Sequence, residues 1–139
     1  MLKNKHDPLY AEFRDYISLD SVKCAYDTLI GATAAIPQFL CEPLPHKKPT
    51  DKPYKRTVNL YSLSQNQLPF AFIINKKHLL FYLRKPAVCS KLWKLDNLKS
   101  QFSDVNKSDA KKAEEWQIRV RNRADANNIV EKILNVWHE

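Results

Sequence analysis

"QLPFAFIINKKHLLFYLRK", residues 67–85, consists of two apolar runs separated by a short polar turn. The first run (67–75) is almost wholly apolar, which is typical of a strand in the centre of a sheet or covered on both faces. The polar NKK at 75–77 predicts a hairpin turn, and the second run (78–85) predicts the returning strand. One face of that strand carries Leu79, Phe81 and Leu83, and the other carries Leu80, Tyr82 and Arg84.

Two further segments alternate with the period of a strand. In 57–63, Val58 and Leu60 share one side against Asn59 and Tyr61. In 115–122 the inward residues are predicted to be Trp116, Ile118 and Val120, and the outward residues Gln117, Arg119 and Arg121. Together with the hairpin, these segments predict an antiparallel sheet of four strands.

Helical patterns surround the strands. Asp7 and Pro8 predict a helix start for 7–17, and an apolar stripe at helical spacing predicts a second helix over 21–36 that Pro37 ends. Further helices are predicted at 88–102 and 124–137, the latter capped by Asn122, with a polar loop at 103–114. The fold class is therefore α+β: two N-terminal helices, three strands, a helix, a strand and a helix. We expect one compact domain over 1–139, with helices mainly on one face of the sheet and an open basic face.

Residues 37–56 hold five of the eight prolines. Such a density disfavours regular structure, so the sequence predicts a loop of some twenty residues. Loops of this length are commonly functional or mobile. This one also carries a cluster of cations.

Charge is distributed unevenly along the chain, whose formal net charge is +8. Residues 1–45 contain four Lys/Arg and six Asp/Glu, a net charge of −2, whereas residues 46–139 contain nineteen and nine, a net charge of +10. A basic region of this kind favours an anionic partner. The single glycine, Gly31, excludes the glycine-rich phosphate loops of nucleotide-binding enzymes.

Arginine binds phosphate through two parallel hydrogen bonds, and aromatic rings beside such cations stack on bases. We therefore predict a non-catalytic nucleic-acid-binding module, with DNA favoured over RNA. Its contact residues on the sheet face are predicted to be Arg119, Arg121, Arg123, Arg84, Tyr82, Lys76 and Lys77. Those of the basic loop are predicted to be Lys47, Lys48, Lys52, Tyr54, Lys55 and Arg56.

Other interpretations remain open. Arg119 and Arg121 are equally compatible with solvated strand residues paired with Glu114, Glu115 or Asp125. A basic face also suits a protein-interaction or inhibitor module that docks an acidic partner. A metal-dependent nuclease would need clustered carboxylates near a lysine, for which the nearest candidates are Asp104 and the segment 109–111.

Cofactor and metal motifs are lacking in the sequence. The four histidines form none of the helical zinc-binding spacings, and no cofactor or metal is expected. Three cysteines without a C-x-x-C spacing predict buried free thiols in a reducing compartment. No apolar run reaches 18 residues and the N-terminus has no apolar core, so we expect a cytoplasmic chain without a membrane partner.

The C-terminal half of the chain gives one resemblance. The hairpin sequence "LLFYLRKPA" (79–87) followed by "EWQIRVRNRADANNIVEKIL" (115–134) resembles small modules found beside bacterial restriction and mobile-element proteins. The resemblance does not extend to one named family. It implies a DNA-related setting.

Overall fold

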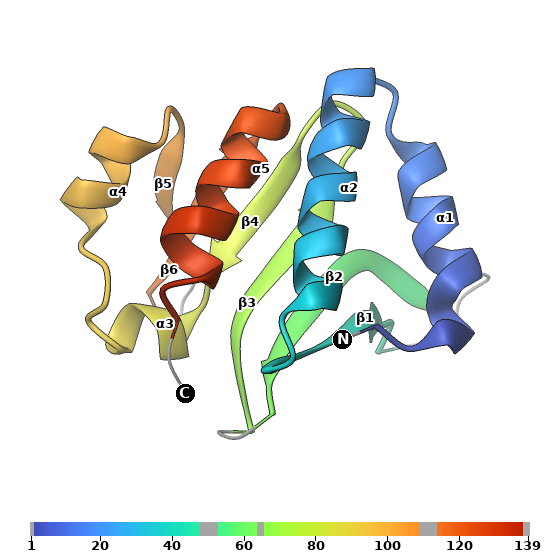
Figure 1. Ribbon diagram of the computed structural model, residues 1–139, viewed down its shortest axis with the longest axis horizontal. Coiled ribbons are helices and arrows are strands. Elements are labelled where there is room, and N and C mark those ends of the chain that lie inside the picture. The colour runs from blue at the N-terminus through green and yellow to red at the C-terminus, as the bar shows by residue number, and fades with distance from the viewer. Residues whose placement is uncertain (1, 48–52, 64–65, 109–113, 138–139) are drawn as a thin grey trace.

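In the part of the chain that the structure describes, six antiparallel strands form one sheet, and the helices pack against one of its faces (Figure 1). The computed structural model describes residues 2–47, 53–63, 66–108 and 114–137. The order across the sheet is β1-β2-β3-β4-β6-β5. The strands are β1 (Phe39–Pro45), β2 (Tyr54–Ser62), β3 (Gln67–Ile74), β4 (Leu79–Leu83), β5 (Val105–Ser108) and β6 (Glu115–Val120). The α+β class and the antiparallel pairing are as predicted, but the number of strands is not.

The α-helices are α1 (Asp7–Tyr16), α2 (Asp20–Ala35), α3 (Lys85–Cys89), α4 (Leu95–Gln101) and α5 (Arg123–Ile129). A short 3₁₀ turn, η1 (Asn4–His6), precedes α1, and a π-helical turn, η2 (Val130–Leu134), continues α5. Of the predicted apolar stripe of α2, Val22, Ala25 and Leu29 are buried, and α2 lies beside α5 over the sheet (Figure 1). The helix ends before Pro37, as predicted, because proline disfavours a helical conformation in the residue before it.

The hairpin of β3 and β4 forms the middle of the sheet. Phe72 lies opposite Phe81 across the two strands, and both rings are fully buried beneath the helices. Phe70 is surrounded by aromatic rings, with ring centroids 5.5 Å from Trp137 and 5.8 Å from Phe39. Replacing such a phenylalanine by alanine costs about 3–5 kcal/mol. The central position predicted from the unbroken apolar run is therefore confirmed, and buried aromatic rings surround it.

The proline-rich segment 37–56 is not an irregular loop throughout, and that prediction is wrong. β1 lies within it and pairs with β2 from Phe39 opposite Ser62 to Pro45 opposite Tyr54. Two prolines are tolerated because β1 is at the edge of the sheet and its register shifts between Pro43 and Pro45. Alternating burial of Phe39, Cys41 and Pro43 fixes the strand to the core.

The predicted helix at 88–102 and loop at 103–114 also differ from the structure. Two short helices, α3 and α4, replace the single helix, and Lys91 between them has a left-handed φ of 63°. β5 then forms within the predicted loop and pairs with β6. β5 shows little alternation in the sequence because Val105 is its one apolar residue. The two strands that the sequence did not predict, β1 and β5, therefore come from segments with weak local signals.

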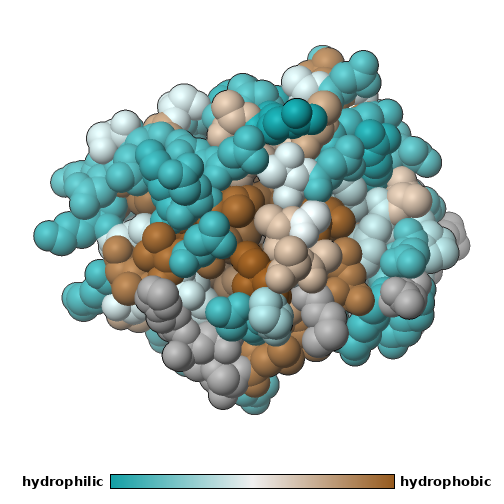
Figure 2. Space-filling view, viewed as in Figure 1, coloured by the Kyte–Doolittle hydropathy of each residue, from teal (hydrophilic) through white to brown (hydrophobic). Residues whose placement is uncertain are grey.

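The helix side of the molecule, shown in Figure 2, is hydrophilic over its upper and outer parts and apolar towards its centre and lower part. The largest exposed apolar residues are Leu19, Leu63 and Leu92. In the described part of the chain no helix has both the length and the apolar character needed to cross a membrane. The cysteines are free, but Cys41 alone is buried; Cys24 is half-buried and Cys89 exposed, against the expectation of buried thiols.

Candidate functional site

β6 orients its residues as the alternation predicted. Trp116, Ile118 and Val120 are buried against the helices, so Gln117 and Arg119 point to the opposite face of the sheet. We call this second face, which the helices leave uncovered, the open face (Figure 1). The chain leaves β6 at Arg121 and enters α5 at Arg123. Asn122 caps α5, accepting a hydrogen bond from the backbone N–H of Asp125 at 2.9 Å.

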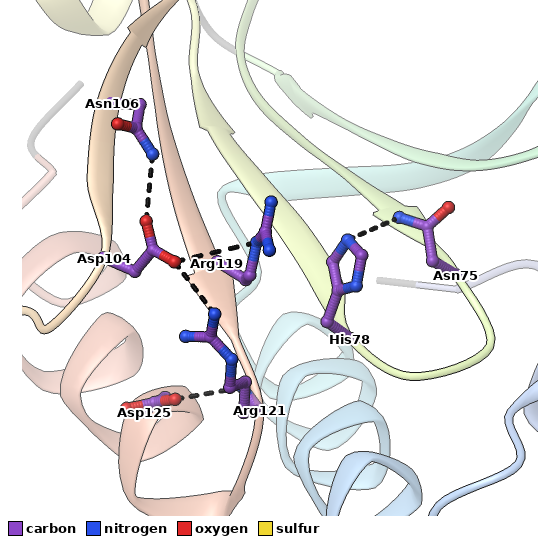
Figure 3. A network of polar contacts seen from close by, with 7 residues as sticks. All are labelled: Asn75, His78, Asp104, Asn106, Arg119, Arg121 and Asp125. Atoms are coloured by element: carbon purple, nitrogen blue, oxygen red, sulfur yellow. Dashed lines mark hydrogen bonds and ion pairs between the residues drawn. The ribbon is translucent and has the colours of Figure 1, made fainter.

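Asp104 is the acid that pairs with the arginines of β6. Its Oδ2 lies 3.0 Å from Nη2 of Arg121 and 3.7 Å from Nε of Arg119, while Asn106 donates to its Oδ1 at 2.9 Å (Figure 3). Burial raises the pKa of Asp104. The hydrogen bonds from Arg121 and Asn106 and the charges of both arginines outweigh that effect, so the pKa lies below its usual value. Asp104 is therefore an anion that holds the two guanidinium groups in place.

The predicted pairing of these arginines with Glu114, Glu115 or Asp125 differs from the structure. Asp125 accepts a hydrogen bond from the backbone N–H of Arg121, not from its guanidinium (Figure 3). Glu114 instead accepts a hydrogen bond from Nε1 of Trp116 and forms an ion pair with Lys107. Glu115 bonds Arg84, with 2.7 Å between Oε2 and Nε. The charge of Arg84 is thus balanced locally, at the end of β4 far from Arg121.

The turn between β3 and β4 brings more cations beside β6. Leu79 lies opposite Val120, so His78, just before Leu79, lies close to Arg119 and Arg121 (Figure 3). Burial lowers the pKa of His78, and the charges of these two arginines lower it further, while Asp104 acts in the opposite direction. Lys76 and Lys77 are exposed at the tip of the same turn.

The beginning of β2 reaches the same end of the sheet. Cζ of Arg56 lies 3.9 Å above the centroid of the Tyr16 ring, and Nζ of Lys76 lies 5.6 Å from that centroid. Both contacts are within the range of cation–π attraction. Ser18 fixes the turn in addition, since its backbone N–H donates to the carbonyl of Lys76 at 2.8 Å.

We call this region the cationic end; it comprises Arg56, Lys76, Lys77, Arg119 and Arg121. It extends from the helix side, where Arg56 meets Tyr16, to the open face, where Arg119 projects. Residues from three separate segments of the chain contribute to it. The sequence predicted an open basic face; in the described part of that face Arg84 is paired with Glu115, and the cations of the cationic end lie at the opposite end of the sheet.

The remaining predicted contact residues have several locations. Tyr54, Lys55 and Arg56 are part of β2 instead of the basic loop. Lys47 is exposed, and a hydrogen bond of 2.9 Å from the backbone N–H of His46 to the carbonyl of Pro53 closes the base of the connection. The positions of Lys48 and Lys52 lie outside the described residues. Arg123 is exposed in the first turn of α5.

Tyr82 and Arg84 line a groove on the open face that also includes Lys55 and Ile73. The groove has a volume of about 330 Å³. Burial raises the pKa of Tyr82, and the nearby charge of Glu115 adds to the effect. Its lining residues are Leu44, Lys55, Thr57, Asn59, Ala71, Ile73, Tyr82, Arg84 and Glu115.

Sequence reasoning missed the roles of three residues that shape the site. Asp104 is a nuclease candidate in the sequence only together with the segment 109–111, which lies outside the described residues; among the described residues no group of three His, Cys, Asp or Glu side chains is placed to hold a metal ion. Tyr16 has the pattern of an ordinary helix residue. His78 has that of a turn residue, and no local pattern shows that β6 will lie beside it.

Comparisons of the chain with protein-family models, curated proteins and solved structures find no match, so its function is argued from its own residues.

Proposed function

We propose that the chain binds the phosphate backbone of nucleic acid through the cationic end. One observation supports this most: Arg56, Lys76, Lys77, Arg119 and Arg121 gather at one end of the sheet from three separate segments. Among the described residues, Asp104 is the acid that pairs with members of this group. Such a surplus of exposed cations releases counterions from a nucleic acid and so favours binding.

Duplex DNA is the first partner to test. Phosphate contacts carry no sequence information by themselves. The proposal is therefore a DNA-binding module without a catalytic step, in which the cationic end positions the chain on the backbone.

The test compares two double variants that remove equal charge. Lys76→Gln with Lys77→Gln alters the cationic end. Lys85→Gln with Lys91→Gln alters two exposed lysines at the other end of the sheet, beyond the pair Leu83 and Trp116. Affinity for a duplex oligonucleotide is measured from 50 to 200 mM salt. The first variant is expected to flatten the plot of log K against log salt by about 0.9 for each phosphate that it no longer neutralises.

The second double variant controls for net charge. It is expected to leave the slope close to that of the unmodified protein. Equal slopes for the two variants would contradict a localised contact. A protein that binds no duplex or single strand even at 50 mM salt would instead favour the protein-interaction alternative, in which the same cations steer an acidic partner.

A further inference from the structure

The groove on the open face is lined differently from the surface around it. Its floor is formed by Asn59 and Ala71, paired across β2 and β3, and both are buried although none of the helices that the structure describes covers this face. Tyr82 pairs with Ala71 from the next strand and forms one wall. A volume of about 330 Å³ is at the small end of the range for ligand-binding pockets. The groove therefore has room for a small chemical group but not for an extended ligand.

Asn59 is the unusual residue of this groove. It is 2% exposed, and its side-chain carbonyl, Oδ1, is buried without a hydrogen-bond partner among the described residues. A buried acceptor without a partner destabilises the folded state, because it has lost its hydrogen bonds to water. An apolar residue would fill the position without that cost. The carbonyl is thus a feature that a hydrogen-bond donor entering the groove would satisfy.

The groove is continuous with the cationic end. Lys55 and Ile73 line it. Ile73 lies opposite Leu80, which in turn lies opposite Arg119 on the open face. At the opposite rim Arg84 is held by Glu115. A ligand in the groove is therefore bordered by one cation on the side of the cationic end and by a neutral ion pair on the other. That arrangement fits a flat polar ring whose attached phosphate lies towards Lys55.

We propose that the groove holds one unstacked nucleobase of the nucleic acid bound at the cationic end. This proposal rests on the proposed function. The base lies against the ring of Tyr82, and an amino or ring N–H on its edge donates to Oδ1 of Asn59. Adenine and cytosine carry such an amino group, and thymine carries a ring N–H. The oxygen has almost no exposed surface in the structure, so side chains that line the groove must move aside when the base enters.

The experiment uses a single-stranded oligonucleotide and the same strand with one abasic position, moved along it in turn. For the unmodified protein, removal of the bound base is expected to weaken binding roughly 5- to 150-fold, since a stacked base contributes about 1–3 kcal/mol. Asn59→Leu, similar in size and without the orphan carbonyl, is expected to reduce this difference several-fold. Its salt slope is expected to stay unchanged, because the variant keeps every phosphate-binding cation.

Gln117→Leu is the matched control, because Gln117 lies on the open face but outside the groove. It is expected to retain the full effect of the abasic position. Equal affinity for the intact and abasic strands at every position, with a normal salt slope, would overturn the groove proposal and leave the phosphate surface standing. The proposal would also be overturned if the abasic position reduced the affinity of the Asn59→Leu variant as much as that of the unmodified protein.

A second measurement needs no variant. Free adenosine and cytidine at millimolar concentration are expected to shift the NMR signals of the Asn59 side-chain amide and the Tyr82 ring. If these shifts occur while oligonucleotides fail to bind, the groove accepts a free base but both the phosphate surface and the proposal of a base held from bound nucleic acid fail. If neither nucleoside shifts these signals, the groove does not bind bases.

Discussion

At the scale of single residues, Asp104 determines how much positive charge the open face presents. Its carboxylate contacts Arg119 and Arg121, and each contact is partly exposed to solvent. Exposed ion pairs contribute about 0–1 kcal/mol each, because water screens them and the side chains lose freedom. The effect of Asp104 on the free energy of unfolding is therefore small. Its effect on the charge that the two guanidinium groups present to solvent is larger.

Asp104→Asn is expected to increase affinity for nucleic acid, because it frees both guanidinium groups and removes one negative charge. It is also expected to lower the free energy of unfolding at pH 7 by about 1 kcal/mol or less. The pKa of Asp104 is lowered in the folded state. The contribution of its carboxylate to the free energy of unfolding is therefore present above the pKa of the unfolded state and is lost as the pH falls through the pKa of the folded state. Urea unfolding at pH 7 and pH 3 and oligonucleotide titration check these expectations.

Glu131→Gln controls for the change in charge, since Glu131 is exposed on η2. It is expected to raise affinity less than Asp104→Asn does. Unfolding free energies of Asp104→Asn and the unmodified protein that differ as much at pH 3 as at pH 7 would argue against the ion pairs described here.

His78 makes the cationic end sensitive to pH. Its pKa is lowered by burial and by Arg119 and Arg121, so stability from neutral His78 is complete above its unfolded pKa of about 6.5 and declines as the pH falls through the lowered value. A bound phosphate opposes these charges and favours protonation. The affinity of the protein for nucleic acid is therefore expected to rise as the pH falls below about 6.5. This rise is expected to be smaller in the His78→Gln variant. Titrations at pH 7.5 and 5.5 would reveal it; parallel pH profiles for the two proteins would argue against it.

At the scale of elements, the junction of β6 and α5 sets the direction of the arginines. The side chain of Asn122 caps α5 through the N–H of Asp125, and the carboxylate of Asp125 in turn accepts from the N–H of Arg121. These two bonds fix the backbone where it turns from strand to helix. Arg121 is consequently held beside Asp104, while Arg123 belongs to the first turn of α5.

Asn122→Ala is expected to lower the free energy of unfolding by about 1 kcal/mol, within the range of 0.5–2 kcal/mol for the removal of an N-cap. Asn127→Ala, at an exposed position inside α5, is expected to be neutral or stabilising because alanine has the higher helix propensity. Denaturant unfolding of both variants checks the difference. Equal decreases would show that the cap at Asn122 has no special role.

The same scale shows which elements are predictable. β3, β4 and β6 follow from the sequence because each has a clear apolar run or period, as does α2. β1 escapes prediction because its prolines disfavour a strand everywhere except at an edge, and edge position is not a local property. β5 is not predictable from the sequence either, because its four residues include a single apolar side chain and therefore show no period.

At the scale of the whole molecule, the positive charge concentrated at one end of the sheet destabilises the folded state. The chain has a net charge of +8, and clustered like charges repel in the folded state more than in the expanded chain. Arg56 and Lys76 both lie over the ring of Tyr16, with Lys77 next along the chain. Salt at physiological strength screens such repulsion over about 8 Å.

Raising NaCl from 10 to 150 mM is therefore expected to increase the melting temperature of the unmodified protein. The increase is expected to be smaller in the Lys76→Gln, Lys77→Gln variant than in the Lys85→Gln, Lys91→Gln variant, because the first relieves the cluster. Thermal unfolding followed by circular dichroism checks this. A melting temperature that falls with salt in all three proteins would mean that attractive pairs, such as Asp104 with Arg121, dominate.

The α+β class, the central hairpin, the inward and outward faces of β6 and the excess of cations after residue 45 all follow from the order of the amino acids. They depend on short-range periodicity and composition, which a local window contains. Other properties arise only in the assembled fold: Arg56, Lys76 and Arg121 meet at one end of the sheet, Asp104 pairs with the arginines, and Asn59 is buried on an uncovered face. Each of these depends on strand register between segments far apart in the chain, and register is set by the packing of the whole core.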